Sequence, residues 1–388
     1  MRYNKPNLPL IKLTFTCKYC PRMTDNIKPI QKILFGCPGT GKSYKIREIA
    51  EKQLNISFDS DTKILKNTVK TVFHPEYTYG DFMGKLLPLT QGTNVMYKFY
   101  PGHFLKVLGM AYRGLIEGNN EHYLLVIDEL NRGNAAAIFG TVFQLLDRES
   151  DHWSSYEVDV SEMELVGLLN SMGYKPNVQT DGLCYLDGTR FDKFCDNLER
   201  DLKNKSNNNG LRVLELLKQN KISIPQNLSI IATINTSDES IYYLDSAFKR
   251  RWNWEYISIE SSRYMLESKY DTSVQLVVHY KAGDDTLLKW VLIIEKINKI
   301  IINNSNLIRR IEDKQIGFWF IKPDDDGKIH LEEVKDKLMF YLWDSVFARD
   351  KRPLEEIISE IEEANIKLIT YDQFIMSTVN FLYYIIKN

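Results

Sequence analysis

The sequence has few of the features that mark secreted, membrane or metal-binding proteins. Its 388 residues include only 5 cysteines, which is too few for a disulfide scaffold. The 6 histidines form no H-E-x-x-H metal motif. The longest apolar candidate, residues 291–302, is interrupted by charged residues such as Glu295 and Lys299, so no run reaches the roughly 18 residues of a membrane span. Residues 1–9 lack the apolar core of a signal peptide. These absences predict a cytoplasmic protein without a membrane partner.

The chain also lacks an excess of charge of one sign. Lysine and arginine total 50 against 51 aspartates and glutamates, for a formal net charge of -1. Any contact with DNA must therefore come from local patches. With 44% hydrophobic and 26% charged residues, the composition is that of a globular protein. Its length predicts one large domain with a smaller one appended.

The cysteines leave three interpretations open. Cys17 and Cys20 have C-x-x-C spacing, and a zinc site would need a second pair, for which Cys184 and Cys195 are poor candidates. A redox pair is the second interpretation. Reduced structural thiols are the third, and we favour them.

A phosphate-binding loop is the strongest feature that is present. Residues 36–43, GCPGTGKS, match G-x-x-x-x-G-K-[ST] between an apolar strand pattern at residues 30–35 and a helical pattern at residues 44–54. In that setting backbone N–H groups and the helix dipole face phosphate oxygens. Lys42 is expected to neutralise the terminal phosphates and Ser43 to hold magnesium; a glycine-rich turn without a ligand is the alternative. The predicted nucleotide-binding residues here are Gly36, Cys37, Pro38, Gly39, Thr40, Gly41, Lys42 and Ser43.

Two adjacent carboxylates follow another apolar strand pattern at residues 123–127. The carboxyl ends of parallel strands share one edge of a sheet, so Asp128 and Glu129 are expected beside the phosphate loop. Asp128 is predicted to contact the magnesium shell, and Glu129 to polarise the water that attacks the terminal phosphate. Negative charges at a helix N-terminus are the alternative explanation.

Two further polar groups fit such a site. Asn235 follows the apolar residues 228–234, and its amide is expected to hold the attacking water; an Asx-turn closing the strand is the alternative. Asp245 begins a short helical turn that ends in Arg250 and Arg251. These arginines are predicted to act on a neighbouring subunit's nucleotide, although cations also favour a helix C-terminus through the dipole alone.

The pattern of strands and helices predicts an α/β fold with a parallel sheet covered on both faces. In the sequence, the strand candidate at residues 69–73 lies between the phosphate-loop strand and the strand that precedes Asp128. This order permits a sheet in which an extra strand is inserted between those two strands. The roughly 75 residues at 151–225 fit no strand of this sheet, and they are far more than an ordinary connection between two elements needs. The expected division is a short N-terminal extension at 1–29, an α/β nucleotide-binding core at 30–260 with an inserted segment at 151–225, and a helical lid with C-terminal helices at 261–388. The strand candidates are residues 30–35, 69–73, 123–127, 228–234 and 254–259.

Taken in order, these motifs resemble the McrB-type AAA+ NTPases, the motor subunits of modification-dependent restriction systems. The resemblance extends from about residue 31 to about residue 347, interrupted by the inserted segment, and includes a stretch similar to the short motif of the family's helical lid, DKQIGFWF at 313–320. The other motifs that carry it are GCPGTGKS at 36–43, FHPEYTYGDF at 73–82, IDELNRGNAAAIFG at 127–140, IATINTSDES at 231–240 and DSAFKRRW at 245–252.

The resemblance implies a ring-shaped, hexameric motor that binds Mg²⁺ and GTP, or ATP, between subunits. It also implies an McrC-like endonuclease partner and restriction of modified or foreign DNA. By position, Asn235 is the sensor, and Asn131 and Arg132 are the asparagine-arginine pair that follows the acidic residues. Asp245, Arg250 and Arg251 act on the neighbour's nucleotide.

The chain departs from the family pattern in three places. Glu239 stands where a basic residue is usual, and Lys249 replaces the first of a frequent arginine triplet. Only about 30 residues precede the phosphate-loop strand, which is too few for the DNA-reading domain often found there. The sequence therefore predicts that recognition and cutting of DNA belong to partners.

Two other functions stay open at this stage. One is an AAA+ ATPase of the MoxR or midasin type that remodels protein complexes. The other is a nucleotide-gated scaffold whose binding of nucleotide only assembles partners. The choice of base is also open, because the nearest match to a guanine-reading Asn-Lys-x-Asp stretch, residues 298–301, lacks its aspartate.

Overall fold

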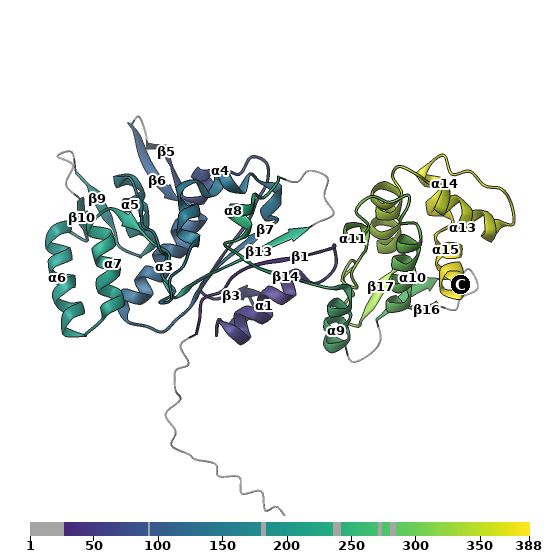
Figure 1. Ribbon diagram of the computed structural model, residues 1–388, viewed down its shortest axis with the longest axis horizontal. Coiled ribbons are helices and arrows are strands. Elements are labelled where there is room, and N and C mark those ends of the chain that lie inside the picture. Colours follow the sequence, from purple (N-terminus) through teal and green to yellow (C-terminus); the bar gives the residue numbers. More distant parts are fainter. Residues whose placement is uncertain (1–26, 92–93, 180–183, 236–241, 271–273, 280–284) are drawn as a thin grey trace, which may run out of the picture.

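The computed structural model describes residues 27–91, 94–179, 184–235, 242–270, 274–279 and 285–388. Cys17, Cys20 and Glu239 lie outside them. Figure 1 shows an α/β unit followed, beyond helix α9 (Ile259–Lys269), by a smaller unit made mainly of helices. None of the described helices is long and apolar enough to cross a membrane.

A five-stranded sheet, entirely parallel, forms the centre of the first unit. Its strand order is β14-β1-β13-β7-β4. The strand inserted between β1 and β7 is therefore β13, whereas β4, which corresponds to the candidate at residues 69–73, lies at the edge. The bounds are β1 Gln31–Gly36, β4 Thr68–Val72, β7 Tyr123–Asp128, β13 Leu228–Asn235 and β14 Asn253–Tyr256.

The sheet is apolar on both faces because helices cover both. Alternate strand residues point to opposite faces, so Ile33 and Leu125 join one core while Leu34 and Leu124 join the other. Helix α1 (Lys42–Gln53) packs on the second face through residues such as Ile49. Helix α3 (His103–Glu117) contributes to the first core. This double covering explains why β7 and β13 are almost continuous apolar runs.

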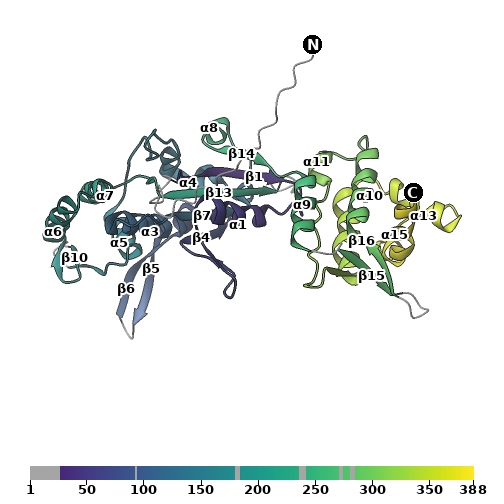
Figure 2. The ribbon, with the colours of Figure 1, turned by 90° about the horizontal axis from the view of Figure 1, so that it is seen from below.

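Short elements surround this sheet. An antiparallel hairpin of β5 and β6 projects from the body (Figure 2), and its strands pair along their full length. The remaining elements of this part are β2 Phe58–Asp59, β3 Ile64–Leu65, α2 Tyr79–Phe82, β5 Gly84–Gln91, β6 Asn94–Pro101, α4 Ala135–Phe139, α8 Ser246–Lys249 and the 3-10 turns Leu130–Arg132 and Gly140–Leu146.

The described residues of the segment predicted to be an insertion build a side layer next to α3. Helix α6 packs on α7, and both α5 and α7 pack on α3. The strands of this segment pair only with one another and do not join the five-stranded sheet. The elements are β8 Val158–Asp159, α5 Glu162–Ser171, β9 Pro176–Val178, β10 Cys184–Leu186, β11 Thr189–Arg190, α6 Phe191–Asn204, α7 Asn208–Lys218 and β12 Lys221–Ile222.

The C-terminal unit has its own apolar core, in which Trp290 and Phe318 are buried. The sequence analysis expects helices here, and the structure adds a small sheet of order β16-β15-β17. Its strands have three to five residues, too few for a clear alternating pattern. The elements are β15 Gln275–His279, β16 Asp285–Lys289, α10 Trp290–Asn303, α11 Ile311–Lys314, β17 Lys328–His330, α12 Leu331–Glu333, the π-helical turns Val334–Met339 and Leu342–Val346, α13 Arg352–Glu362, α14 Tyr371–Met376 and α15 Thr378–Lys387.

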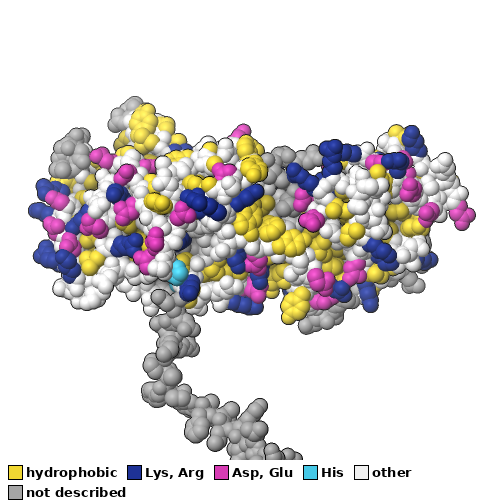
Figure 3. Space-filling model, viewed as in Figure 1, with side chains coloured by type: hydrophobic (Ala, Val, Ile, Leu, Met, Phe, Trp, Pro, Cys, Tyr) yellow, Lys and Arg dark blue, Asp and Glu magenta, His cyan; other side chains and the backbone are white. Residues whose placement is uncertain are grey.

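Charged side chains are mixed over the surface. On the face drawn in Figure 3, basic and acidic residues are interspersed among the described residues. This arrangement agrees with the formal net charge of -1 and presents no broad field of one sign on that face.

We expect Arg148 to stabilise the base of the side layer. Its guanidinium donates to the carbonyl oxygens of His152, Pro225 and Leu228 at 2.9, 3.0 and 2.9 Å, and so joins both ends of that layer to β13. Arg148→Met should lower the free energy of unfolding by about 2–4 kcal/mol, because the carbonyls lose charged donors. Thermal unfolding followed by calorimetry measures this, with Arg200→Met on the exposed face of α6 as the control. Equal melting temperatures for the two variants would contradict the expectation.

Candidate nucleotide site

The phosphate loop connects β1 to α1, as the sequence predicts. Gly39 and Gly41 have φ angles of 78° and 81°, a region that residues with a Cβ rarely adopt. Helix α1 begins at Lys42 directly after the loop, so its first backbone N–H groups and the positive end of its dipole face the loop. This arrangement suits an anion.

Lys42 and Ser43 lie at the start of α1. The buried Lys42 ammonium donates to the carbonyl oxygens of Gly36 at 2.9 Å and Cys37 at 3.1 Å, so it lies within the curve of the loop. Ser43 is exposed on the first turn.

Burial raises the pKa of the Cys37 thiol to about 11, so this thiol is protonated at neutral pH, which agrees with a role in filling space within the loop. Thr40, the other buried polar residue of the loop, donates to the carbonyl oxygen of Cys37 at 3.0 Å.

The acidic pair stands at the same edge of the sheet. Asp128 is the last residue of β7, and Glu129 follows it with a φ of 55°, an uncommon conformation for a residue other than glycine and one that clusters at functional sites. The Asn235 amide donates to Glu129 Oε1. The sequence therefore predicted residues that lie side by side in the fold, and their roles in hydrolysis stay predictions.

Thr233 is the residue of this cluster that sequence reasoning missed. Its buried hydroxyl donates to Asp128 Oδ1 at 3.0 Å and accepts from the Glu129 backbone N–H at 3.2 Å. Thr233 lies two residues before Asn235 on β13 and so shares a face of the sheet with it. A polar residue two positions before the predicted sensor was the signal available in the sequence.

Asn131 and Arg132 occupy the short turn after the acidic pair. The buried Asn131 side chain donates from Nδ2 to the Asn235 carbonyl oxygen at 3.1 Å, and the backbone carbonyl of Asn131 accepts from the Tyr242 N–H at 2.8 Å. Arg132 is exposed. The structure thus places Asn131 as a support for Asn235, and a direct contact of either residue with nucleotide or a neighbouring subunit stays a prediction.

Arg250 and Arg251, the two arginines predicted to act on a neighbouring subunit's nucleotide, lie in different environments. Arg251 donates to Asp147 Oδ2 from Nη2 at 2.7 Å and from Nε at 3.0 Å, and its guanidinium lies 4.0 Å from the centre of the Phe143 ring. Only 9% of this side chain is exposed. Arg250 is exposed beside it, and Asp245 caps α8 by accepting from the Phe248 N–H at 2.6 Å. Of the two arginines, the geometry favours Arg250 for a contact outside its own subunit.

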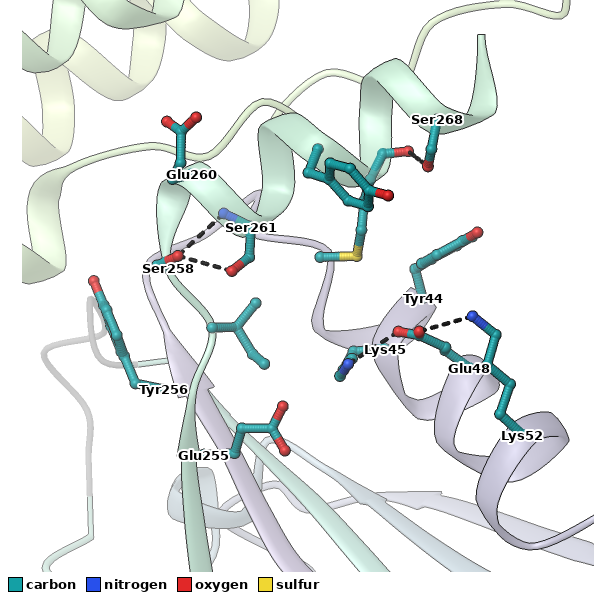
Figure 4. A pocket seen from close by; sticks show the side chains of 13 residues that line it. Tyr44, Lys45, Glu48, Lys52, Glu255, Tyr256, Ser258, Glu260, Ser261 and Ser268 are labelled. Atoms are coloured by element: carbon teal, nitrogen blue, oxygen red, sulfur yellow. Dashed lines mark hydrogen bonds and ion pairs between the residues drawn. The ribbon is translucent and has the colours of Figure 1, made fainter. Parts of the chain in front are cut away.

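A pocket of about 620 Å³ opens beside α1, between the α/β unit and α9. Figure 4 shows side chains from α1, from the end of β14 and from α9 around it. Glu48 lies between Lys45 and Lys52, with both ammonium groups 3.0 Å from its carboxylate, and these hydrogen bonds lower the pKa of Glu48. The pocket is therefore lined by both aromatic and charged groups. Its lining residues include Tyr44, Lys45, Glu48, Glu255, Tyr256, Glu260, Tyr264 and Met265.

The C-terminal unit contacts the phosphate loop through the segment that resembles the family's lid motif. The backbone N–H of Gly317 donates to the Pro38 carbonyl at 2.9 Å, and that of Trp319 donates to the Gly39 carbonyl at 2.9 Å. A Cβ on Gly39 would lie 2.6 Å from the backbone nitrogen of Phe320. Two segments about 280 residues apart in sequence therefore meet at the site through backbone atoms that glycine alone allows so close.

The residues present fit a magnesium ion bound together with nucleotide. Among the described residues no group of three or more His, Cys, Asp or Glu side chains could hold a metal by itself. Mg²⁺ usually takes one or two protein oxygens and completes its octahedral shell with phosphate and water. The exposed Ser43 hydroxyl and the Asp128 carboxylate are oxygen donors of that kind.

Comparison with known proteins identifies relatives of the chain. It is 28% identical over 341 residues to YdiS, a component of the type II restriction enzyme BsuMI of Bacillus subtilis (strain 168), across 82% of this chain and 80% of that protein. It is 24% identical over 230 residues to the EcoKMcrB subunit of the type IV methyl-directed restriction enzyme of Escherichia coli (strain K12). The chain is similar to McrB-type AAA+ proteins. These relatives confirm the resemblance that the motifs indicate, and the structure confirms the predicted α/β core with a mainly helical C-terminal region.

The extent of these matches differs. The match to the E. coli McrB-type subunit covers 59% of this chain and 35% of that protein. No family model matches. Among solved structures, a Cytophaga hutchinsonii protein aligns over 90% of this chain and 84% of its own at 13% identity and a TM-score of 0.26. PCH-2 of C. elegans aligns over 91% and 60% at 10% identity and a TM-score of 0.20.

We expect the adjacent arginines to differ in their effect on stability. Arg251→Ala should lower the free energy of unfolding by about 2 kcal/mol, because it removes a largely buried ion pair and leaves Asp147 without its partner. Arg250→Ala, its matched control, should melt like the wild type because exposed side chains away from special features contribute little. Thermal unfolding of both variants measures the difference, and an equal loss in both would contradict it.

Proposed function

We propose that this chain is a magnesium-dependent nucleoside triphosphatase, with GTP favoured over ATP, that acts as the motor of an McrB-like restriction system. The observation that carries the proposal is the contact between Asn235 and Glu129 beside the phosphate loop. In the sheet register Gly36 pairs with Asn235, so the first residue of the loop and the predicted sensor are neighbours. The similarity to McrB-type relatives supports the same function.

The loop and the start of α1 bind the phosphates in this proposal. Backbone N–H groups of the loop and the helix dipole attract the phosphate oxygens. Lys42 exchanges the carbonyl oxygens of Gly36 and Cys37 for oxygens of the terminal phosphates. Ser43 and Asp128 hold the magnesium ion, which when bound neutralises charge on the phosphate oxygens.

Glu129 acts on the water. Its carboxylate orients a water molecule in line with the terminal phosphorus and accepts a proton as the new P–O bond forms and the bond to the bridging oxygen breaks. Asn235 holds the carboxylate through Oε1, and Thr233 holds the Glu129 backbone. Thr233 is therefore a positioning residue, because it acts through Glu129.

A ring of subunits completes the site in this proposal. Arg250 is exposed on the turn that Asp245 caps, and it stabilises charge on the nucleotide of the adjoining subunit in a hexamer. Arg251 keeps that turn attached to Asp147. Both relatives are named as parts of larger restriction enzymes, which supports a separate McrC-like endonuclease as partner, with DNA reached through the assembly.

The pocket beside α1 is the proposed place for the base. A base joined to phosphates at the start of α1 lies next to Tyr44, and the pocket also holds the carboxylate of Glu260, whereas those of Glu48 and Glu255 are bonded to lysines. Carboxylates are acceptors only. Guanine offers N–H donors at N1 and N2, whereas the corresponding N1 of adenine is an acceptor, so this lining favours guanine.

Replacing Glu129 tests the chemistry. Glu129→Gln should lower turnover at saturating nucleotide by about 10²- to 10⁴-fold, the usual contribution of a general base, while nucleotide binding is retained. Phosphate release and calorimetric binding measure the two properties. Glu121→Gln, exposed just before the same strand, is the control and should keep full turnover. Full turnover by Glu129→Gln would contradict its role.

Partner dependence tests the biological role. We expect phosphate release to be faster with GTP than with ATP, and to rise when the product of the neighbouring endonuclease gene is added, because that subunit is proposed to stimulate hydrolysis. The measurement is phosphate release with each nucleotide, with and without that product. Equal rates with both nucleotides would refute the base preference, and a lack of stimulation would refute the restriction-motor role.

A further inference from the structure

Trp319, in the lid segment that contacts the phosphate loop, has a polar atom that its own fold leaves without a partner. The side chain is half-buried, and its indole Nε1 is inaccessible to solvent and has no hydrogen-bond acceptor among the described residues. The buried indole of Trp290 in the same unit shows the usual arrangement, because its N–H donates to the Phe318 carbonyl at 2.9 Å. Buried polar atoms without a partner are uncommon and ask for an explanation.

The indole lies directly against the phosphate loop. A Cβ built on Gly41 would lie 3.4 Å from Cδ1 of Trp319, the ring atom bonded to Nε1. The edge that carries the N–H group is therefore next to the residue that precedes Lys42. The ring stacks on Tyr44 with centroids 6.3 Å apart and an interplanar angle of 15°.

Backbone contacts hold Trp319 in this place. Its own N–H donates to the Gly39 carbonyl at 2.9 Å. A Cβ on Gly317 would lie 2.2 Å from the Gly39 carbonyl oxygen. A side chain at either glycine would therefore push the lid segment away from the loop. The distance between the indole and the loop is thus fixed by direct contact between the two backbone segments.

We propose that the Trp319 indole N–H donates a hydrogen bond to an oxygen in the sugar–phosphate part of the nucleotide, which makes Trp319 a nucleotide-contact residue supplied by the lid. This inference rests on the proposed function, which puts the phosphates on the loop and the base in the pocket. Trp319 lies between them, since it contacts Gly41 of the loop and Tyr44 of the pocket. An indole N–H is a donor only, so its partner is an oxygen acceptor, which a phosphate or a ribose offers.

The proposed contact links the lid to the bound nucleotide. The segment that carries Trp319 is bonded to Pro38 and Gly39, so loop and lid engage one nucleotide from two sides. Loss of the indole N–H weakens binding without removing the loop, Lys42 or the stacked ring.

Trp319→Phe is the test, because phenylalanine keeps an aromatic ring beside Tyr44 while the N–H donor is lost together with one of the two fused rings. The full chain carrying Glu129→Gln, to prevent turnover, is titrated calorimetrically with GTP and with ATP. We expect the Kd to rise about tenfold or more, as for loss of a hydrogen bond to a charged group. The nucleotide-free variant should melt close to the temperature of the Trp343→Phe control, because each variant loses one fused ring and Trp319→Phe loses no hydrogen bond within the fold.

Trp343→Phe is the matched control. Trp343 stacks on Phe374 within the C-terminal unit, with centroids 5.9 Å apart, and its replacement should leave the Kd unchanged. Nucleotide should also change the tryptophan fluorescence of the Glu129→Gln chain, and Trp319→Phe should remove that change. Tripolyphosphate identifies the acceptor: a weakened Kd for it as well supports a phosphate oxygen, and a weakened Kd for nucleotide alone supports a ribose oxygen.

The outcomes distinguish the inference from the proposed function. An unchanged Kd in Trp319→Phe, while the parent chain binds nucleotide and Lys42→Ala does not, overturns the inference and leaves the proposed function standing. Absence of nucleotide binding by the parent chain itself overturns both.

Discussion

The parallel pairing of β13 with β1 on one side and β7 on the other is the constraint on which the site depends. It puts Asn235 next to Gly36 and the Thr233 hydroxyl next to Asp128. Residues from three distant parts of the chain therefore share one edge of the sheet without a dedicated loop to hold them. Helices cover both faces, so this edge is fixed by the apolar packing of a whole domain.

Two segments outside the sheet complete the surroundings of the phosphate loop. The lid segment reaches the loop through main-chain bonds to Pro38 and Gly39, and α8 carries Arg250 to the surface while Arg251 ties the same turn to Asp147. The adjacent arginines thus lie in opposite environments, because Arg251 is held in an ion pair and Arg250 is exposed. The phosphate loop is enclosed from one side and, in the proposed ring, completed from another.

Much of this arrangement could be predicted from local patterns. The strand-loop-helix unit around Lys42 and the acidic pair after β7 have signatures within a dozen residues, because each depends on one strand and the turn that follows. The role of β13 as the inserted strand, the small sheet of the C-terminal unit and the hydroxyl of Thr233 had weaker signals. Strand order and short strands are set by contacts between distant segments, which leave little local trace.

The sequence by itself determined the motifs, their order and therefore the resemblance to McrB-type proteins, since the glycines at 39 and 41 and the carboxylates at 128 and 129 each lie in one short segment. Only the tertiary structure decided which side chains meet. It assigned Arg251 to Asp147 and left Arg250 exposed, and it brought Trp319 against Gly41 across about 280 residues of chain. The reason is physical: a local pattern reflects backbone geometry within one element, whereas partners are chosen when apolar faces pack and bring polar groups from remote elements within hydrogen-bonding distance.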